Sequence, residues 1–452
     1  MTRLCALIFC LIPVAPLAHV SERALVLLLP TEIYIRSGVI SVALTVALLF
    51  LLPPRFFASV FSLKPLFSIP KIPLTQTISL LSTLLLFAAI YAGINGSRDP
   101  LSNPLPLLIW SIWWITLPVL SALFGNIWSV LNPWSGLLSF LPLRPPFQPP
   151  KTYLPAVFIL LLFSLFVLAD IAPDDPDRLA WITLGYWIFT ALMLALFGPA
   201  WLKRGEPFSI FFAQMAKLSP FSLTQRQLSL SVPGTRLIKT PIPLSLAFLL
   251  IVALGAGSFD GLNETFWWLA QININPLEFP GRSAVALPNS FGLIGGILLL
   301  GLVFAGTIWI GLALTGTNDA FKELFPKLTL SLIPIALGYH IAHYLTSFMV
   351  GSQYALKAMS DPMGTGADIL GLGQFYVTTS FFNIPETVET IWLTQAGAIV
   401  IGHILAVLIA HGIALDTLKS HKKATLSQLP VAAFMLAYTF FGLWILAQPT
   451  GA

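Results

Sequence analysis

Long, nearly uninterrupted apolar stretches dominate the chain, and short polar segments separate them. A helix that crosses a bilayer needs about 20 mostly apolar residues. By this criterion we expect ten spans, at residues 34–53, 74–94, 103–123, 153–172, 179–199, 243–258, 289–314, 326–350, 388–415 and 425–447. The pattern predicts an all-α, polytopic transmembrane helix bundle that forms one domain, residues 19–452.

A further apolar run precedes these spans and is typical of a signal sequence. It covers residues 4–17, follows Arg3, and is too short to cross a bilayer. We expect residues 1–18 to be cleaved off, which makes His19 the first residue of the mature chain. Pro16 stands where the cleavage motif favours a small residue, so an uncleaved anchor is the alternative.

Composition and charge agree with a membrane protein. Charged residues make up 9% of the chain, against roughly a quarter in soluble domains. With the mature N-terminus outside, the inner loops hold sixteen Lys and Arg and the outer loops six. This asymmetry obeys the positive-inside rule and places the C-terminus outside as well. We expect a lipid bilayer as the surrounding partner and no nucleic acid.

Three connecting segments are long enough to carry structure of their own. The inner segment 200–242 combines an amphipathic stretch with a basic loop, which is typical of an interfacial helix on anionic lipid. The outer loops 259–288 and 351–387 are long enough to form a cap. Fourteen of the eighteen Asp and Glu lie on the outer side, where they either concentrate cations or simply solvate loop tips.

Histidines in two spans give the clearest indication of chemistry. His340 and His343 lie three residues apart, on one face of a helix, and His403 and His411 lie in the next span. Ionisable side chains are costly in a bilayer and usually mark a functional site. Both cysteines lie in residues 1–18, so the mature chain offers no thiolate ligand.

The expected site is a transition-metal site on the outer side of the membrane. Imidazole and carboxylate groups together suit copper or zinc. The candidate ligands are His340, His343, His19, Asp260, Asp361 and His403. His19 would chelate copper through its amino and ring nitrogens, and His403 would approach from below. Three alternatives stay open: histidines that hydrogen-bond between helices, a proton relay, or axial ligation of a haem.

Several short motifs resemble a family of polytopic bacterial membrane proteins commonly labelled fenitrothion hydrolase. They are the Ala18–His19 junction, LFGNIWSVLNPW (123–134), WLKRGEPF (201–208), SFDGL (258–262), GYHIAHY (338–344), SDP (360–362), GHILAVLIAHGIAL (402–415) and SQLP (427–430). Asn126 and Gly412 depart from the family's pattern. The resemblance implies metal-dependent hydrolysis of organophosphate esters, with His340, His343, Asp260 and Asp361 around the metal.

Three functions are therefore compatible with the sequence. The first is metal handling at a periplasm-facing His/Asp site of a multi-pass protein in the bacterial inner membrane. The second is a membrane-embedded, metal-dependent hydrolase of phosphoester-type substrates, so whether the protein is an enzyme stays open. The third is a proton-coupled solute transporter. In each, a metal ion or small-molecule substrate arrives from the outer side.

Overall fold

The computed structural model describes residues 26, 29–51, 53, 59–68, 74–140, 145–224, 226–278 and 281–450. The expected signal sequence and His19 lie outside these residues.

Nine helical segments in the described part of the chain are long and apolar enough to cross a membrane. They are α3 (Thr31–Leu51), α5 (Thr75–Asn95), the continuous α6–η1–α7 (Pro104–Phe124), α11 (Pro176–Phe197), α15 (Leu244–Asn263), α17 (Arg282–Thr315), the η4–α18–α19 segment (Asn318–Ser360), α20 (Pro385–Leu418) and α22 (Leu429–Ala447). A shorter apolar helix, α10 (Leu154–Ala169), takes the position of the remaining expected span, 153–172. The prediction of an all-α polytopic bundle is confirmed.

Short elements connect these helices. They are α8 (Trp128–Leu131), α9 (Ser135–Leu138), α12 (Trp201–Arg204), α13 (Pro207–Met215), η2 (Ala216–Leu218), α14 (Thr235–Ile238), α16 (Phe266–Gln271), η3 (Pro276–Glu278), η5 (Ser380–Asn383) and α21 (His421–Ser427). Within the eighth span, α18 (Phe321–Thr329) precedes α19 (Leu332–Ser360). A small antiparallel sheet, in the order β1–β3–β2, joins Lys64–Ser68, Gln227–Leu230 and Phe221–Thr224.

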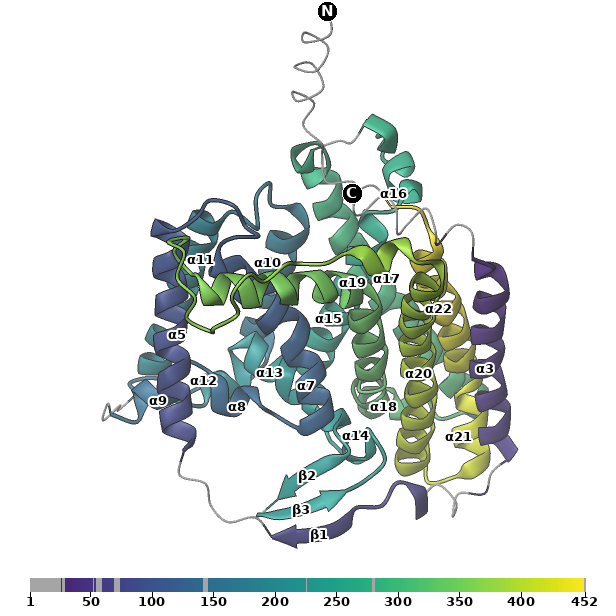
Figure 1. The fold of residues 1–452 in the computed structure, drawn as a ribbon. Coiled ribbons are helices and arrows are strands. Elements are labelled where there is room, and N and C mark those ends of the chain that lie inside the picture. Colours follow the sequence, from purple (N-terminus) through teal and green to yellow (C-terminus); the bar gives the residue numbers. More distant parts are fainter. Residues whose placement is uncertain are drawn as a thin grey trace, which may run out of the picture.

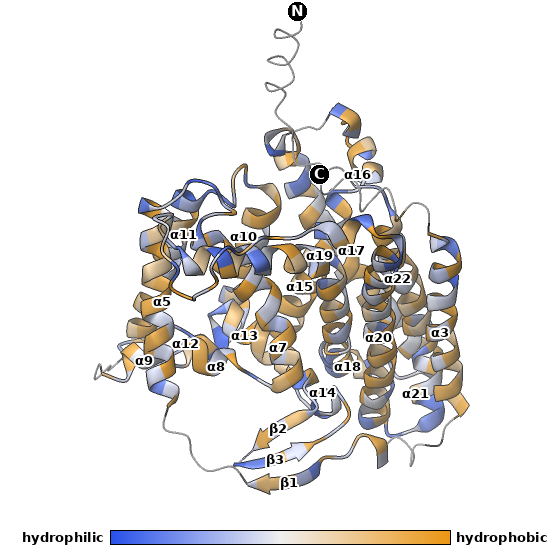
Figure 2. Ribbon diagram, viewed as in Figure 1, coloured by the Kyte–Doolittle hydropathy of each residue, from blue (hydrophilic) through white to orange (hydrophobic). Residues whose placement is uncertain are grey.

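Apolar side chains cover the flank of the bundle. Leu44, Leu81 and Leu302 are 59%, 59% and 72% exposed and point away from the protein core. Figure 2 shows hydrophobic residues along the middle of the helices, with polar ones more frequent at both ends. Such a surface is unfavourable in water and favourable in lipid, so the chain is a multi-pass membrane protein.

The inner end, as the positive-inside rule assigns it, carries the sheet and α14 (Figure 1). The segment 200–242 contributes β2, β3 and the buried helix α13. Phe208, Phe211 and Phe212 of α13 are at most 5% exposed. The expected interfacial helix is therefore wrong for this stretch. Its apolar residues face protein on several sides, because α13 packs between α7 and α10.

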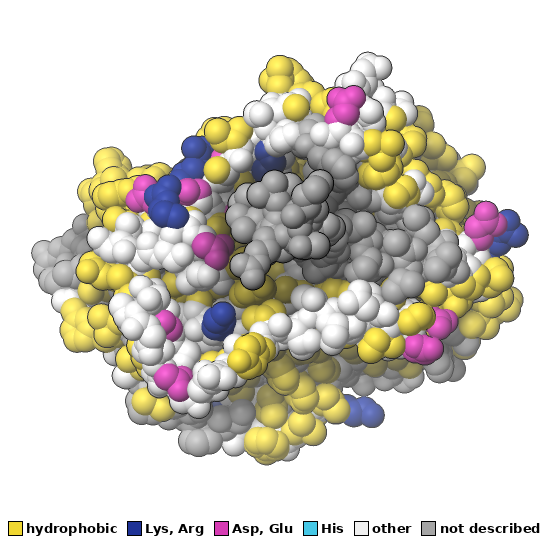
Figure 3. All heavy atoms as spheres, turned by 45° about the horizontal axis from the view of Figure 1, so that its top comes forward, with side chains coloured by type: hydrophobic (Ala, Val, Ile, Leu, Met, Phe, Trp, Pro, Cys, Tyr) yellow, Lys and Arg dark blue, Asp and Glu magenta, His cyan; other side chains and the backbone are white. Residues whose placement is uncertain are grey.

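The outer end is covered mainly by the continuation of α19 beyond its expected end at residue 350. Figure 1 shows this C-terminal part lying across the top of the bundle. Ala355 and Ala358 pack there against Leu107 of α6. Acidic and basic side chains are scattered among uncharged ones on this end (Figure 3). Some of its acids form ion pairs, as Arg98 does with Asp175 at 2.8 Å.

Two glycines let α19 and α20 approach closely. A Cβ added at Gly402 would lie 2.6 Å from the carbonyl oxygen of Pro334, and one at Gly338 would lie 2.6 Å from that of Ala398. No side chain fits at such distances, so both positions require glycine. This contact fixes the helix that carries His340 and His343 against the helix that carries His403.

Candidate functional site

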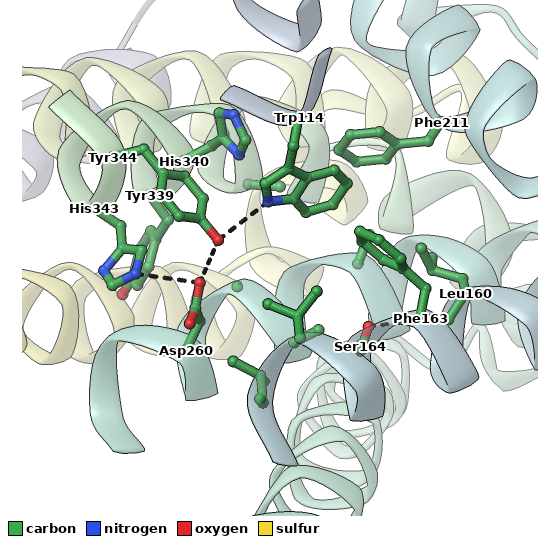
Figure 4. A pocket seen from close by; sticks show the side chains of 16 residues that line it. Trp114, Leu160, Phe163, Ser164, Phe211, Asp260, Tyr339, His340, His343 and Tyr344 are labelled. Atoms are coloured by element: carbon green, nitrogen blue, oxygen red, sulfur yellow. Dashed lines mark hydrogen bonds and ion pairs between the residues drawn. The ribbon is translucent and has the colours of Figure 1, made fainter. Parts of the chain in front are cut away.

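A cavity in the outer half of the bundle brings together His340, His343 and Asp260. It lies among η1 (Leu108–Thr116), α10, α13, α15 and α19, and Figure 4 shows its lining. The cavity volume is about 50 Å3, which is room for three or four water molecules. Asp260 lies near the outer end of α15, three residues before Asn263. The cavity is therefore near the outer membrane boundary.

An acid–base pair forms the polar end of the cavity. His343 Nε2 lies 3.2 Å from Asp260 Oδ2, and the two side chains are 25% and 12% exposed. Tyr344 donates a hydrogen bond from its hydroxyl to the same carboxylate oxygen. The carboxylate thus has two side-chain partners on α19, which compensate for its removal from water.

Trp114 extends this network to the third span. Its Nε1–H donates to the Tyr344 hydroxyl oxygen at 3.1 Å, so Tyr344 accepts from Trp114 and donates to Asp260 (Figure 4). The order is fixed, because an indole nitrogen only donates and a carboxylate only accepts. Trp114, Tyr344 and Asp260 therefore link three transmembrane segments through one hydrogen-bonded chain.

The third span is π-helical where it meets the cavity. The backbone N–H of Leu117 bonds to the carbonyl of Ile112, five residues back, which is the π-helical pattern. Such turns are rare and frequently occur at functional sites. Pro118 follows and has no N–H to donate, so it disturbs the regular α-helical ladder at this point. The unusual backbone here positions Trp114 and the carbonyl of Ile115 toward α19.

His340 faces this π-helical segment rather than the carboxylate. Its Nε2 lies 3.0 Å from the carbonyl oxygen of Ile115, and its ring packs edge-on against those of Trp114 and Tyr344. A carbonyl only accepts, so His340 donates from Nε2, and Nδ1 is the acceptor nitrogen of the neutral ring. The expected shared face with His343 is confirmed, since both line the cavity. The two rings have different partners.

The remaining sequence candidates lie elsewhere. The carboxylate of Asp361 accepts from the backbone N–H groups of Thr365 and Gly366 at 2.9 and 2.8 Å. These hydrogen bonds, that of Gly366 first, lower the pKa of Asp361, whose role here is to hold a loop. His403 is fully buried, and its Nδ1 lies 2.8 Å from the carbonyl oxygen of Ile399. Of the expected candidates among the described residues, the structure brings only His343 and Asp260 into direct contact with each other. Among the described residues, no group of three or more His, Cys, Asp or Glu side chains is arranged to hold a metal ion.

The pair does have the spacing of two metal ligands. Two donor atoms about 2.0 Å from a tetrahedral zinc ion lie about 3.3 Å apart. The separation of His343 Nε2 and Asp260 Oδ2 is 3.2 Å. A metal bound by these two residues would keep further positions open for water or an incoming donor.

The sequence reasoning missed Tyr344 and Trp114. Tyr344 directly follows His343, and a tyrosine four residues after His340 lies on the same helix face. Trp114 belongs to a Trp–Trp pair shortly before Pro118, and a proline within a span is a signal of irregular backbone. Both features were visible in the sequence, but their contact with Asp260 depends on how three spans pack.

Comparison with known proteins adds no relative: no protein-family model, no curated protein and no solved structure matches this chain.

Proposed function

We propose that the protein binds copper or zinc in its outer cavity, through His343 and Asp260, and takes part in metal handling at the bacterial inner membrane. The observation that carries the proposal is the His343–Asp260 pair, 3.2 Å apart, on the wall of a cavity near the outer membrane boundary. Imidazole with carboxylate is a ligand set suited to these metals. The cavity would face the periplasm under the positive-inside assignment.

A site with only two protein ligands favours exchange of the bound metal ion over its storage. Structural zinc sites are normally closed by four protein ligands. A site with two leaves positions that water or a donor from another carrier fills, so the ion enters and leaves by ligand substitution. The hydrogen bond from Tyr344 orients the Asp260 carboxylate, as outer partners of metal ligands generally do.

Calorimetric titration of the purified protein with Zn²⁺ tests this proposal. His343→Ala and Asp260→Asn should each weaken binding at the outer cavity by more than about 100-fold, since each removes one of two ligands, and loss of a residue that only hydrogen-bonds to a ligand already costs roughly 10–100-fold. Asp361→Asn is the matched control, because Asp361 is an outer carboxylate that does not line the cavity, and this variant should bind Zn²⁺ as the wild type does. Wild-type affinity in both His343→Ala and Asp260→Asn would refute the proposal.

A hydrolase is the second candidate, and the apolar wall of the cavity favours it. Phe163, Phe211 and Leu160 line the side away from Asp260. Such a wall accommodates an aryl group, while a water held at the polar end attacks phosphorus and His343 accepts its proton; the bond from phosphorus to the aryl oxygen breaks, and the aryloxide leaves. Turnover of an aryl phosphotriester by the wild type, lost in His343→Ala, would support this function. No turnover with added zinc or copper would exclude it for that substrate class.

A further inference from the structure

A second group of polar side chains meets at the opposite, inner end of the bundle. His421, Thr425 and Gln428 recur at intervals of four and three residues, so they share one face of α21 and the turn that ends it. This face packs against α20, where His411 lies two turns before the helix ends. The ring centroids of His411 and His421 are 6.2 Å apart, with the ring planes nearly perpendicular.

Several polar atoms of this group are buried without a hydrogen-bond partner. They are His421 Nε2, Thr425 Oγ1 and Gln428 Nε2. Native proteins nearly always pair such atoms with protein, water or an ion. Three of them on one helix face, beside a second imidazole, therefore point to a ligand that belongs between α20 and α21.

The space beside this group is small. His411 and Gln428 line a second cavity of about 10 Å3, together with apolar residues of α3, α20 and α22, whereas His421 and Thr425 lie outside its lining. That volume accommodates about one water-sized particle. A bare ion or a single water fits, and an organic substrate does not.

The chemistry of the group favours a transition-metal ion. When two imidazoles bind one ion at 2.0–2.1 Å, their ring centroids lie about 5 to 6.5 Å apart, depending on the bond angle. The 6.2 Å separation of His411 and His421 falls in this range. Rotation of the Gln428 amide by half a turn would place its oxygen where the nitrogen now lies, as a further ligand for the metal ion. Lys422 and Lys423 are exposed and lie outside the face of α21 that His421, Thr425 and Gln428 share.

We propose that His411 and His421, supported by Gln428 and Thr425, form an inner site for copper or zinc. The site deepens the proposed metal handling, because it gives the ion a second binding position at the other end of the same bundle. It uses none of the residues of the outer cavity, so either site can fail without the other.

Electron paramagnetic resonance with Cu²⁺ as the probe separates the two sites. The purified full chain in detergent is titrated with Cu²⁺, and nitrogen hyperfine structure counts the bound imidazoles. The outer pair supplies one imidazole and the inner group two. His343→Ala should retain the two-imidazole centre, and His421→Gln should lose it. Lys422→Gln, a change at the neighbouring exposed residue, should leave the spectrum as in the wild type.

The inner site is refuted if His421→Gln retains a two-imidazole centre, or if His343→Ala binds no copper. The proposed outer site fails separately, if His343→Ala leaves the one-imidazole signal unchanged. The Gln428→Glu variant provides a second test of the inner site, which does not depend on correct folding of His421→Gln. It adds a carboxylate beside the two imidazoles and should raise the copper affinity of the inner site about tenfold. An unchanged affinity in this folded variant would also contradict the proposal.

Discussion

Removal of the Tyr344 hydroxyl should destabilise the fold more than removal of the Tyr438 hydroxyl, which lies in the same bundle. In Tyr344→Phe, Asp260 loses a hydrogen-bond donor and the Trp114 Nε1–H loses its acceptor at 3.1 Å. A hydrogen bond to a charged group contributes about 1.5–3 kcal/mol, and a buried donor without an acceptor costs about 1–3 kcal/mol. Because Tyr344 is partly exposed, water replaces part of the lost hydrogen bonding in the variant. We expect a loss of about 2–4 kcal/mol in the free energy of unfolding.

Tyr438→Phe is the matched control. The Tyr438 hydroxyl lies 2.7 Å from Ser258 Oγ, which keeps its own bond to the carbonyl of Leu254 at 2.8 Å. Loss of this one neutral hydrogen bond should cost about 1 kcal/mol. Reversible unfolding in mixed detergent micelles, followed by circular dichroism, measures both variants. An equal loss in the two, or a smaller loss in Tyr344→Phe, would refute the proposed link between Trp114 and Asp260.

Three further predictions concern the surroundings of the site. Gly402→Ala should cost about 1–3 kcal/mol by overpacking against a backbone carbonyl of α19, whereas Gly397→Ala, with open space around it, should be neutral in the same unfolding assay. His403→Leu should not lower stability, because the Nδ1 hydrogen bond of His403 only reaches the carbonyl of Ile399 in its own helix, and its Nε2 is buried without a hydrogen-bond partner; a loss of proton or metal transport without a loss of stability would instead favour a proton relay. Backbone N–H groups lower the pKa of Asp361 and of Asp368 below the unfolded value of 3.8. Their stabilisation of the outer loop is therefore present above pH 3.8 and lost as pH falls through the lower folded values. The protection of backbone amides in residues 361–373, corrected for the intrinsic exchange rate at each pH, should be high at pH 5 and fall as the pH drops below 3.8; protection already lost at pH 5 would contradict this.

The fold was largely predictable because the bilayer imposes one strong rule. Backbone groups in lipid must pair within a helix, so long apolar runs such as 388–415 become spans whatever their detailed sequence. The observed helices differ from the expected spans mainly at their ends; α20, for example, covers Pro385–Leu418. The 16-residue α10 shows the limit of judging a span by its length alone. It is too short to meet the length criterion, but it packs among longer helices of the bundle.

The site was predictable only in part, since spacing along one helix is local and contact between helices is not. His340 and His343 line one cavity, as their spacing implied, and Asp260 joins His343. The sequence could not show that His340 turns to the carbonyl of Ile115 in a π-helical segment. It also gave no sign that Asp361 would be held by its own loop, because glycines that allow such turns are equally common in binding loops.

Elemental analysis of the purified protein and of its His343→Ala variant tests the central claim most directly. Both proteins should be extracted under identical conditions and analysed for copper and zinc per chain. Our account predicts about one equivalent of metal fewer in the variant than in the wild type, whatever the inner site holds. Equal metal content in the two proteins, with both correctly folded, would contradict a metal site at His343 and Asp260.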